Sequence, residues 1–375
     1  MKKERLFYLD FIRAFATIII ILTHFNACFM NGSPELLSKA IISTNFFNIY
    51  IGSFGVSLFL IISGASLMYV YQDKCNVKTF YKKRFLNIYP MFWIAYTIAF
   101  LLRFIAEKGI WIDIPKYRII FTALGFGEYL NTFSIATFSI IGEWFIGLII
   151  LIYIVFPILL FLINKFPKSL AVGAIVVFIA TYFLLPDSIP KNVILSIRIP
   201  EVLIGMYFVK YVKKINLPTA LVGVAVLALN TFLKPTFNDS IQTIYVGLAS
   251  FVVLVYIAKF IKNVTVQKIC SIICKYSYSI FLVHHVIIYR ILERFDLNSI
   301  SKLYVYILFL ACLLATFLVA YLLQRLFDCV MKVFTNDKKD KVLEKEKPIL
   351  SESLDTKPDV DIKSENTKVE VLNSK

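Results

Sequence analysis

The sequence has little charge, few histidines and no long polar linkers between its apolar stretches. Charged residues make up 17% of its 375 residues and hydrophobic residues 59%, whereas soluble domains carry about 25% charged and about 45–50% apolar residues. A soluble protein of this length would show amphipathic stripes and polar connections instead. The shortage of charge therefore excludes an ordinary soluble domain and indicates an integral membrane protein.

In place of amphipathic stripes, the chain has apolar blocks of about 17–25 residues, the length that crosses ~30 Å of hydrocarbon. We predict an all-α polytopic transmembrane helix bundle with about ten spans, at 11–30, 50–71, 86–106, 141–163, 169–185, 193–211, 217–233, 241–261, 272–292 and 303–328. Segment 117–130 is short and contains Gly125, Gly127 and Glu128. We expect it to be interfacial or re-entrant rather than an eleventh span.

The net charge of +16 does not indicate a nucleic-acid partner, because the Lys and Arg residues lie between apolar blocks rather than in one soluble patch. With ten spans and a cytoplasmic N-terminus, 22 of them fall near the cytoplasmic face and 8 in external loops. Cytoplasmic loops carry such an excess of Lys and Arg. We therefore predict a multi-pass protein of the cell (plasma) membrane, surrounded by lipid, with both termini in the cytoplasm.

The six cysteines show neither a disulfide framework nor a metal motif. Cys270 and Cys274 have no histidine and no second cysteine pair near them in the sequence, so their spacing fits a helix turn better than a metal site. We expect no bound metal and an inert role for all six: Cys28, Cys75, Cys270, Cys274, Cys312 and Cys329.

The composition changes near residue 335. Residues 335–375 contain no aromatic side chain, and nine lysines there oppose ten acidic residues. Such a segment cannot bury enough apolar surface to fold. We predict a transmembrane domain over 1–334 and a disordered cytoplasmic tail over 335–375.

The first predicted span contains ionisable residues, which are costly in a membrane and usually functional. Arg13 and His24 are eleven residues apart, and eleven steps of ~100° return to nearly the same helix face. Asp10 and Thr17 share that face. One alternative is a buried Asp10–Arg13 pair with His24 satisfying a neighbour. We favour a polar stripe that faces a wet cavity inside the bundle.

The other two histidines of the chain, His284 and His285, lie in the ninth predicted span at a depth similar to that of His24. Adjacent residues on a helix point ~100° apart. We therefore expect at most one of them to aim directly at a given site, and at least one to be a polar packing residue.

A basic segment, Phe80–Pro90, precedes the third predicted span. It is either an ordinary positive-inside flank or a cationic site for a phosphate-rich donor. Arg84 is best suited to bidentate phosphate contact, and Lys82 and Lys83 adjoin it.

Two further pairs of residues remain. Glu143, an interfacial carboxylate or an acid/base group, and Trp144 open the fourth predicted span at its outer end. Arg198 and Glu201 lie three residues apart on the sixth span, where we expect them to pair with each other.

Taken together, these segments resemble the acyltransferase 3 family of multi-pass membrane O-acyltransferases over roughly residues 5–330. The family often has a second arginine where this chain has Asn87, and many members have a glutamate where it has Ile149. The resemblance is carried, in the family's order, by Arg13 with His24, the run Gly55–Gly64, Arg84–Pro90, Trp144 with Tyr153 and Pro157, and Ser277–His284.

The resemblance implies transfer of an acyl group, usually acetyl from acetyl-CoA, to a hydroxyl of a surface or exported glycan or a lipid-linked sugar. Acyl-CoA would be a donor substrate, with no permanently bound cofactor. A hydroxyl nucleophile needs a base that titrates near neutral pH, which favours His24. The expected catalytic residues are His24, Arg13, Asp10 and His284, the donor-binding residues Arg84, Lys83, Lys82 and Asn87, and the further candidates Glu143, Trp144 and His285.

The sequence leaves several points open: the acceptor, acetyl against a longer acyl group, direct against relayed transfer, and the oligomeric state. A transporter or flippase is the main alternative, since buried charges are also normal there. It would predict paired broken helices and inverted repeats, and the sequence shows neither.

Overall fold

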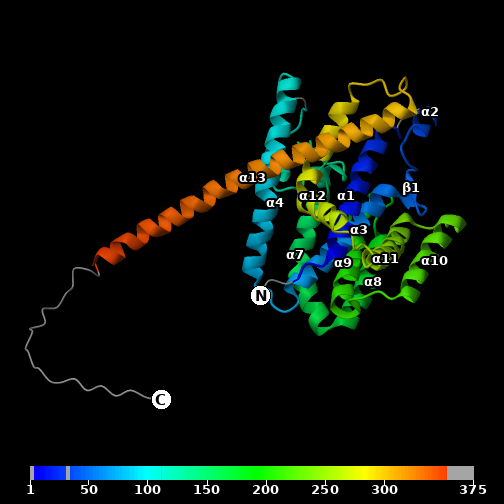
Figure 1. The fold of residues 1–375 in the computed structure, drawn as a ribbon, viewed down its shortest axis with the longest axis horizontal. Coiled ribbons are helices and arrows are strands. Elements are labelled where there is room, and N and C mark those ends of the chain that lie inside the picture. Colours follow the sequence, from blue (N-terminus) through cyan, green and yellow to red (C-terminus); the bar gives the residue numbers. More distant parts are fainter. Residues whose placement is uncertain (1–3, 31–33, 111, 143, 353–375) are drawn as a thin grey trace, which may run out of the picture. The chain divides into compact units, whose positions relative to one another are not determined.

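The computed structural model describes residues 4–30, 34–110, 112–142 and 144–352, with side chains up to Val333. The chain divides into two units, Met1–Arg325 and Leu326–Lys375. The first unit is a bundle of helices (Figure 1), and the sheet in the described residues is a single two-stranded hairpin. The predicted all-α class is confirmed.

Eight helices of the described chain are long and apolar enough to cross a membrane. The last of them has an apolar part, Lys302–Val333, and continues to Glu352. The eight are α1 (Phe7–Ala27), α3 (Ile51–Tyr71), α4 (Val77–Ala106), α7 (Trp144–Lys165), α8 (Pro167–Leu184), α11 (Asp239–Ala258), α12 (Val264–Leu292) and α13 (Lys302–Glu352).

The remaining two predicted spans correspond to shorter helices. α9 (Leu195–Tyr207) contains Pro200 and continues as one π-helical stretch, η3 (Phe208–Val212). α10 (Leu217–Leu233) has 17 residues, a rise of ~26 Å against ~30 Å of hydrocarbon. The predicted count of ten is therefore approximate: eight helices meet the length and composition of a span.

Asparagine side chains fix where several helices begin. Asn76, Asn216 and Asn263 each accept a hydrogen bond from a backbone N–H in the first turn of α4, α10 and α12, at 2.9–3.0 Å. Such caps satisfy N–H groups that have no partner within the helix. They also explain why α4 and α12 begin several residues before the predicted spans.

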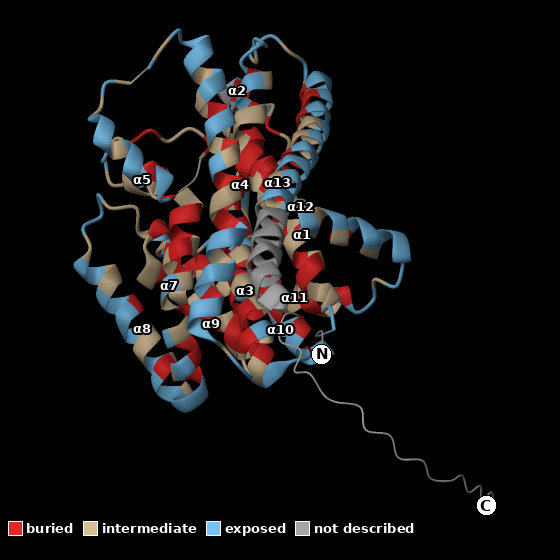
Figure 2. Ribbon diagram, turned by 90° about the vertical axis from the view of Figure 1, so that its left-hand side faces the viewer, coloured by how far each residue is buried: buried red, intermediate tan, exposed pale blue. Residues whose placement is uncertain are grey.

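The core lies around α3, which is buried along most of its length (Figure 2). A Cβ atom on Gly64 would lie 2.0 Å from the carbonyl oxygen of Val202, and one on Gly205 would lie 1.9 Å from that of Ile61. The backbones of α3 and α9 thus touch where small residues face each other, as in many membrane bundles.

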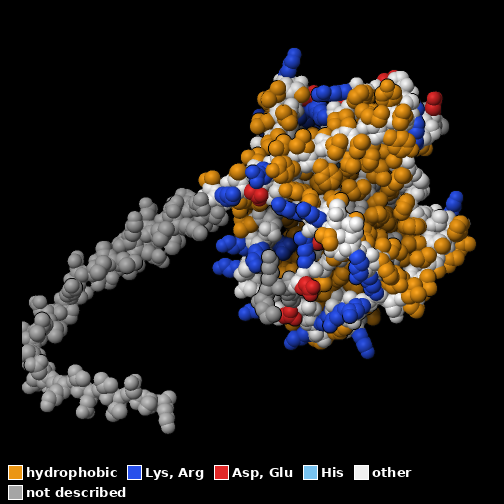
Figure 3. Space-filling model, in the orientation of Figure 1, with side chains coloured by type: hydrophobic (Ala, Val, Ile, Leu, Met, Phe, Trp, Pro, Cys, Tyr) orange, Lys and Arg blue, Asp and Glu red, His pale blue; other side chains and the backbone are white. Residues whose placement is uncertain are grey.

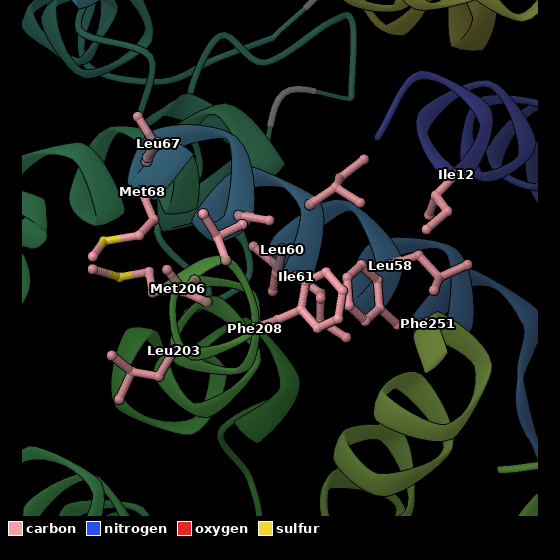
Figure 4. Packing of buried hydrophobic residues seen from close by; sticks show 14 of the residues in the cluster. Ile12, Leu58, Leu60, Ile61, Leu67, Met68, Leu203, Met206, Phe208 and Phe251 are labelled. Atoms are coloured by element: carbon pink, nitrogen blue, oxygen red, sulfur yellow. The ribbon is translucent and has the colours of Figure 1, made fainter. Parts of the chain in front are cut away.

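Larger side chains fill the space beside this crossing. Met68 of α3 lies beside Met206 of α9, and Phe208 packs edge-on against Phe251 of α11 with ring centroids 5.0 Å apart (Figure 4). This packing holds α3, α9 and α11 in fixed positions next to the site described below.

The segment between α4 and α7 is attached to α4 by side chains. It contains η1 (Lys116–Arg118), α5 (Ile119–Ala123) and α6 (Gly127–Asn131). Tyr89, Trp93 and Tyr96 of α4 donate hydrogen bonds of 2.6–3.0 Å to its carbonyl oxygens. None of these helices is long enough to span, in keeping with the predicted interfacial or re-entrant segment.

Short elements connect α1 to α3. They are α2 (Pro34–Ser38) and an antiparallel hairpin of β1 (Asn45–Phe46) and β2 (Ile49–Tyr50). Phe47 and Asn48 have positive φ angles of 51° and 62°, the conformation of a tight two-residue hairpin turn. A further short helix, η2 (Lys191–Val193), precedes α9.

Lysine and arginine side chains gather at the lower end of the face in Figure 3, below a broad apolar surface. In the same orientation, Figure 1 shows the start of α4 at that end. The predicted cytoplasmic side of the bundle is this basic end.

The second unit contains the part of α13 from Leu326 onward. Because α13 is helical to Glu352, the first part of the predicted tail is helix. Residues 353–375 lie outside the described residues, and the division at 334 stays a prediction.

Candidate active site

A cavity of about 410 Å³ lies among α1, α3, α4, α7 and α12. Of its described lining residues, two are cationic and none is acidic, so its electrostatic field favours an anionic ligand. The polar or aromatic-hydroxyl residues that line it are Arg13, His24, Ser63, Ser66, Arg84, Asn87, Tyr153, Ser277 and Tyr278.

The residues that line the cavity differ in exposure. Val70, next to the last residue of α3 and 53% exposed, and the exposed Asn87 of α4 line one part of it. His24, near the end of α1, lines it together with Gly142 and Trp144. The exposed lining residues therefore lie near the end of α3 and in the first half of α4, and the half-buried His24 lies near the end of α1.

The polar stripe predicted on α1 is partly in this cavity. Arg13 and His24 both line it, as predicted, whereas Asp10 and Thr17 are buried outside it. The Thr17 hydroxyl donates a 2.8 Å hydrogen bond to the Arg13 carbonyl oxygen within the helix.

The guanidinium of Arg13 is held by neighbouring helices. It donates to the Ser66 hydroxyl at 3.2 Å and to the Cys274 sulfur at 3.7 Å. The Cys274 thiol in turn donates to the Asp10 carboxylate at 3.2 Å. Arg13 is thus linked to α3 directly and to Asp10 through α12.

The alternative of a direct Asp10–Arg13 ion pair, which we did not favour, is not what the structure shows. Asp10 forms its ion pair with Arg5, just before α1 begins, and this carboxylate raises the pKa of the Arg5 guanidinium. Cys274, for which we expected an inert role, contacts both Asp10 and Arg13. It lies three residues before the cavity residue Ser277, a spacing on one helix face that could have indicated it.

Arg84 is enclosed by aromatic rings. Its guanidinium carbon lies 5.3–5.7 Å from the ring centroids of Tyr71, Phe80 and Tyr153, and its Nη2 donates to the Tyr71 hydroxyl at 3.2 Å. Cation–π contacts of this kind hold a guanidinium in place. Its buried Nε has no hydrogen-bond partner in the described part of the chain.

The predicted donor-binding group is only partly assembled. Asn87 lies three residues after Arg84 and lines the same cavity. Lys82 and Lys83 are exposed and do not line it. The reason is helical geometry, because residues one and two positions away from Arg84 point ~100° and ~200° away from its direction. Tyr71 and Tyr153, which sequence reasoning did not select, complete the surroundings of Arg84.

The three histidines meet in space. The His24 ring centroid lies 4.9 Å from that of His284 and 5.0 Å from that of His285. Neither His284, which we expected to be catalytic, nor His285 lines the cavity itself, so both act at the site only through their contact with His24. Two rings ~100° apart on α12 can both touch a third ring that lies between their directions.

The outer end of the cavity is formed by the chain that leads into α7. Gly142, with φ +71°, lines the cavity, and a Cβ there would lie 3.2 Å from the His285 ring. Trp144 is the first residue of α7 and also lines the cavity. Glu143, the other candidate predicted here, lies outside the described residues.

The buried Arg198–Glu201 pair is a separate feature of α9. Arg198 Nε lies 3.1 Å from Glu201 Oε2, and both side chains are almost completely buried. The predicted pairing is confirmed, and neither residue lines the cavity. Within the described residues, no group of three or more His, Cys, Asp or Glu side chains is placed to hold a metal ion.

Comparison with known protein families places most of the chain in one of them. The family model described as an acyltransferase domain, that of the acyltransferase 3 family, matches residues 6–325. No curated protein matches the chain, and no solved structure matches it. The match spans every helix that lines the cavity, as the sequence resemblance predicted. The chain therefore belongs to the acyltransferase 3 family and is a membrane acyltransferase.

Proposed function

We propose that the protein transfers an acyl group, in the first place acetyl, from acyl-CoA to a hydroxyl of a cell-surface or exported glycan or a lipid-linked sugar. The observation that carries the proposal is that one cavity is lined by two guanidinium groups and by the imidazole of His24. The guanidinium groups can bind an anionic thioester donor, and the imidazole can act as the base that a hydroxyl nucleophile needs.

Arg84 and Arg13 are the proposed phosphate-binding groups. Arginine binds phosphate through parallel N–H donors, and both guanidinium groups line the same cavity. Asn87 is an exposed residue of the cavity lining. The donor would enter at the basic end, which we propose faces the cytoplasm.

His24 is the proposed general base. It lies eleven residues beyond Arg13 on α1, a rise of ~16 Å. The pantetheine arm of CoA likewise separates the thioester from the phosphates, so phosphates near the two arginines would place the thioester deeper, toward His24. A base at this position can deprotonate a hydroxyl that enters from the other side of the membrane.

The proposed reaction is direct transfer. His24 takes the proton of the acceptor hydroxyl as the hydroxyl oxygen attacks the thioester carbonyl. The new carbon–oxygen bond forms, the carbon–sulfur bond breaks, and the proton passes to the departing CoA thiolate. The products are the acyl ester of the acceptor and free CoA. The glycan acceptor and the cell membrane as the location rest on the family resemblance.

The test uses the full-length protein, purified and reconstituted in lipid vesicles. Acetyl-CoA labelled in the acetyl group is supplied with surface polysaccharides and lipid-linked sugars, and a parallel series uses labelled longer acyl-CoA. We expect label on a glycan, release of free CoA, and a preference for acetyl. Movement of an intact substrate across the vesicles without label transfer to any acceptor would contradict the proposal and favour a transporter.

A further inference from the structure

His284 is held in one orientation by the backbone of its own helix. Its Nδ1 lies 2.8 Å from the carbonyl oxygen of Phe281 and 3.2 Å from that of Ile280. A carbonyl oxygen only accepts hydrogen bonds, so Nδ1 carries the proton. In a neutral imidazole the other nitrogen, Nε2, then has a free lone pair and acts as an acceptor.

That acceptor is buried and unused. The side chain of His284 is 2% exposed, and its Nε2 has no hydrogen-bond partner in the described part of the chain. Buried polar atoms in folded proteins are nearly always hydrogen-bonded, so one without a partner needs an explanation. The explanation must be a donor that reaches Nε2 in the working protein.

His24 is placed to supply that donor. Its ring centroid is 4.9 Å from that of His284, and the ring planes are inclined by 65°. Rings at this centroid separation are in contact, so a rotation of the His24 side chain can bring one of its nitrogens toward Nε2. No described residue donates to or accepts from the His24 ring in the structure, so the rotation breaks no hydrogen bond within the described chain.

The ring of His285, unlike that of His284, is not fixed in one tautomer by the described part of the chain. Its ring lies 5.0 Å from His24 and 4.5 Å from the ring of Tyr289. In the described chain no backbone carbonyl binds its ring nitrogens, so nothing fixes which of them carries the proton. It can pack against His24 without selecting a tautomer.

We propose that His284 is a positioning residue that fixes the tautomer of His24. Its Nε2 accepts a hydrogen bond from the His24 nitrogen that carries the proton, which leaves the lone pair of the other nitrogen facing the cavity. When His24 takes a second proton from the acceptor hydroxyl, the same hydrogen bond becomes charge-assisted and stronger. The inference rests on the proposed role of His24 as the base, and His284 itself touches no substrate.

Two substitutions test the roles of the two nitrogens of His284 separately. In His284→Gln, the amide oxygen can take the place of Nε2 as an acceptor. In His284→Asn, the amide nitrogen can take the place of Nδ1 and keep the bond to the backbone, but the acceptor at Nε2 is lost. We expect both variants to retain the wild-type KM for acyl-CoA, and the Asn variant to have a kcat at least tenfold below that of the Gln variant.

Equal kcat values in the two variants would overturn the proposal, and so would a loss confined to KM. Equal melting temperatures of the two variants in detergent show that a difference in their kcat values does not come from a difference in folding.

A spectroscopic test does not depend on turnover. The chain has only three histidines, so ¹⁵N-histidine labelling of full-length protein with a histidine-free affinity tag gives three imidazoles to assign. We expect His284 to be protonated at Nδ1, and His24 to be in a single tautomer in the wild type and in a mixture in His284→Asn.

A proton on Nε2 of His284, or an unchanged His24 tautomer in the Asn variant, would overturn the proposal. The two proposals can fail separately. If no acyl-CoA is consumed with any acceptor but the tautomer of His24 still changes in His284→Asn, the proposed reaction is wrong and the positioning contact is right.

Discussion

Arg13 and His24 lie eleven residues apart on α1 and line the same cavity. Their separation along the helix axis, ~16 Å, is about half of the hydrocarbon thickness of a membrane. One helix thereby carries a cationic group in its first half and an imidazole in its last turn. The proposed chemistry takes place inside the membrane-spanning part of the protein, where phosphate binding and proton transfer are separated along one helix.

Arg84 should determine the affinity for the donor. Arg84→Lys retains the charge but loses the planar guanidinium between the aromatic rings, so we expect the KM for acyl-CoA to rise. Arg84→Ala should raise it by about 10- to 100-fold, the value of one or more hydrogen bonds to a charged group. Initial rates at varied acyl-CoA concentration measure both effects.

Lys78 provides the matched control, because it is a basic and exposed residue on the same helix. Lys78→Ala should leave the KM within about twofold of the wild type, since surface charges contribute little. If Lys78→Ala and Arg84→Ala raised the KM equally, the general charge of α4 rather than the enclosed guanidinium would bind the donor.

Cys274 should act through Arg13 and Asp10, which it connects. Cys274→Ser keeps a group that can donate to Asp10 and accept from Arg13, whereas Cys274→Val removes both contacts. We expect Cys274→Val to raise the KM for acyl-CoA by about 2- to 10-fold, the value of a net hydrogen bond, and Cys274→Ser to remain close to the wild type. Two variants with the wild-type KM would show that this connection has no functional role.

The contact between α3 and α9 should be sensitive to a single methyl group. In Gly205→Ala the new Cβ would lie 1.9 Å from a backbone oxygen, so the helices must move apart, at a cost of about 1–3 kcal/mol. Gly173 of α8 has no neighbouring atom within 4 Å of its Cβ position. Gly173→Ala should be neutral or stabilising by up to about 1 kcal/mol. Thermal unfolding in detergent compares the two, and equal melting temperatures would contradict the close approach.

The orientation can be tested at α10, one of the two helices that are shorter than a membrane span. Reporter fusions after Lys214 and after Lys234 flank this helix. We expect a cytoplasmic signal from the first and an external signal from the second, and a cytoplasmic signal from a fusion after Lys375. Signals from the same side for the first two fusions would mean that α10 does not cross the membrane.

The sequence was sufficient to predict the features that depend on a single helix. Apolar length located eight helices that can span, and the eleven-residue spacing placed Arg13 and His24 in one cavity. The ten predicted spans included α9 and α10, which are too short to meet the same criterion, because apolar composition alone does not show where a proline or a cap ends a helix.

Contacts between helices could not be predicted from the sequence. Periodicity shows which face of a helix a residue occupies but not which helix faces it. The thiol partner of Asp10, Cys274, lies 264 positions away in the chain and could not be found in this way. For the same reason, the approach of both His284 and His285 to His24 became visible only in three dimensions.

The most direct test of the account is the turnover of His24→Ala in lipid vesicles with labelled acetyl-CoA and an acceptor that the wild type modifies. General base catalysis contributes about 10²- to 10⁴-fold to rate. We therefore predict a kcat at least about 100-fold below that of the wild type, with the KM for acyl-CoA unchanged and the protein still folded and inserted. A kcat close to that of the wild type would remove His24 from the reaction and contradict the account.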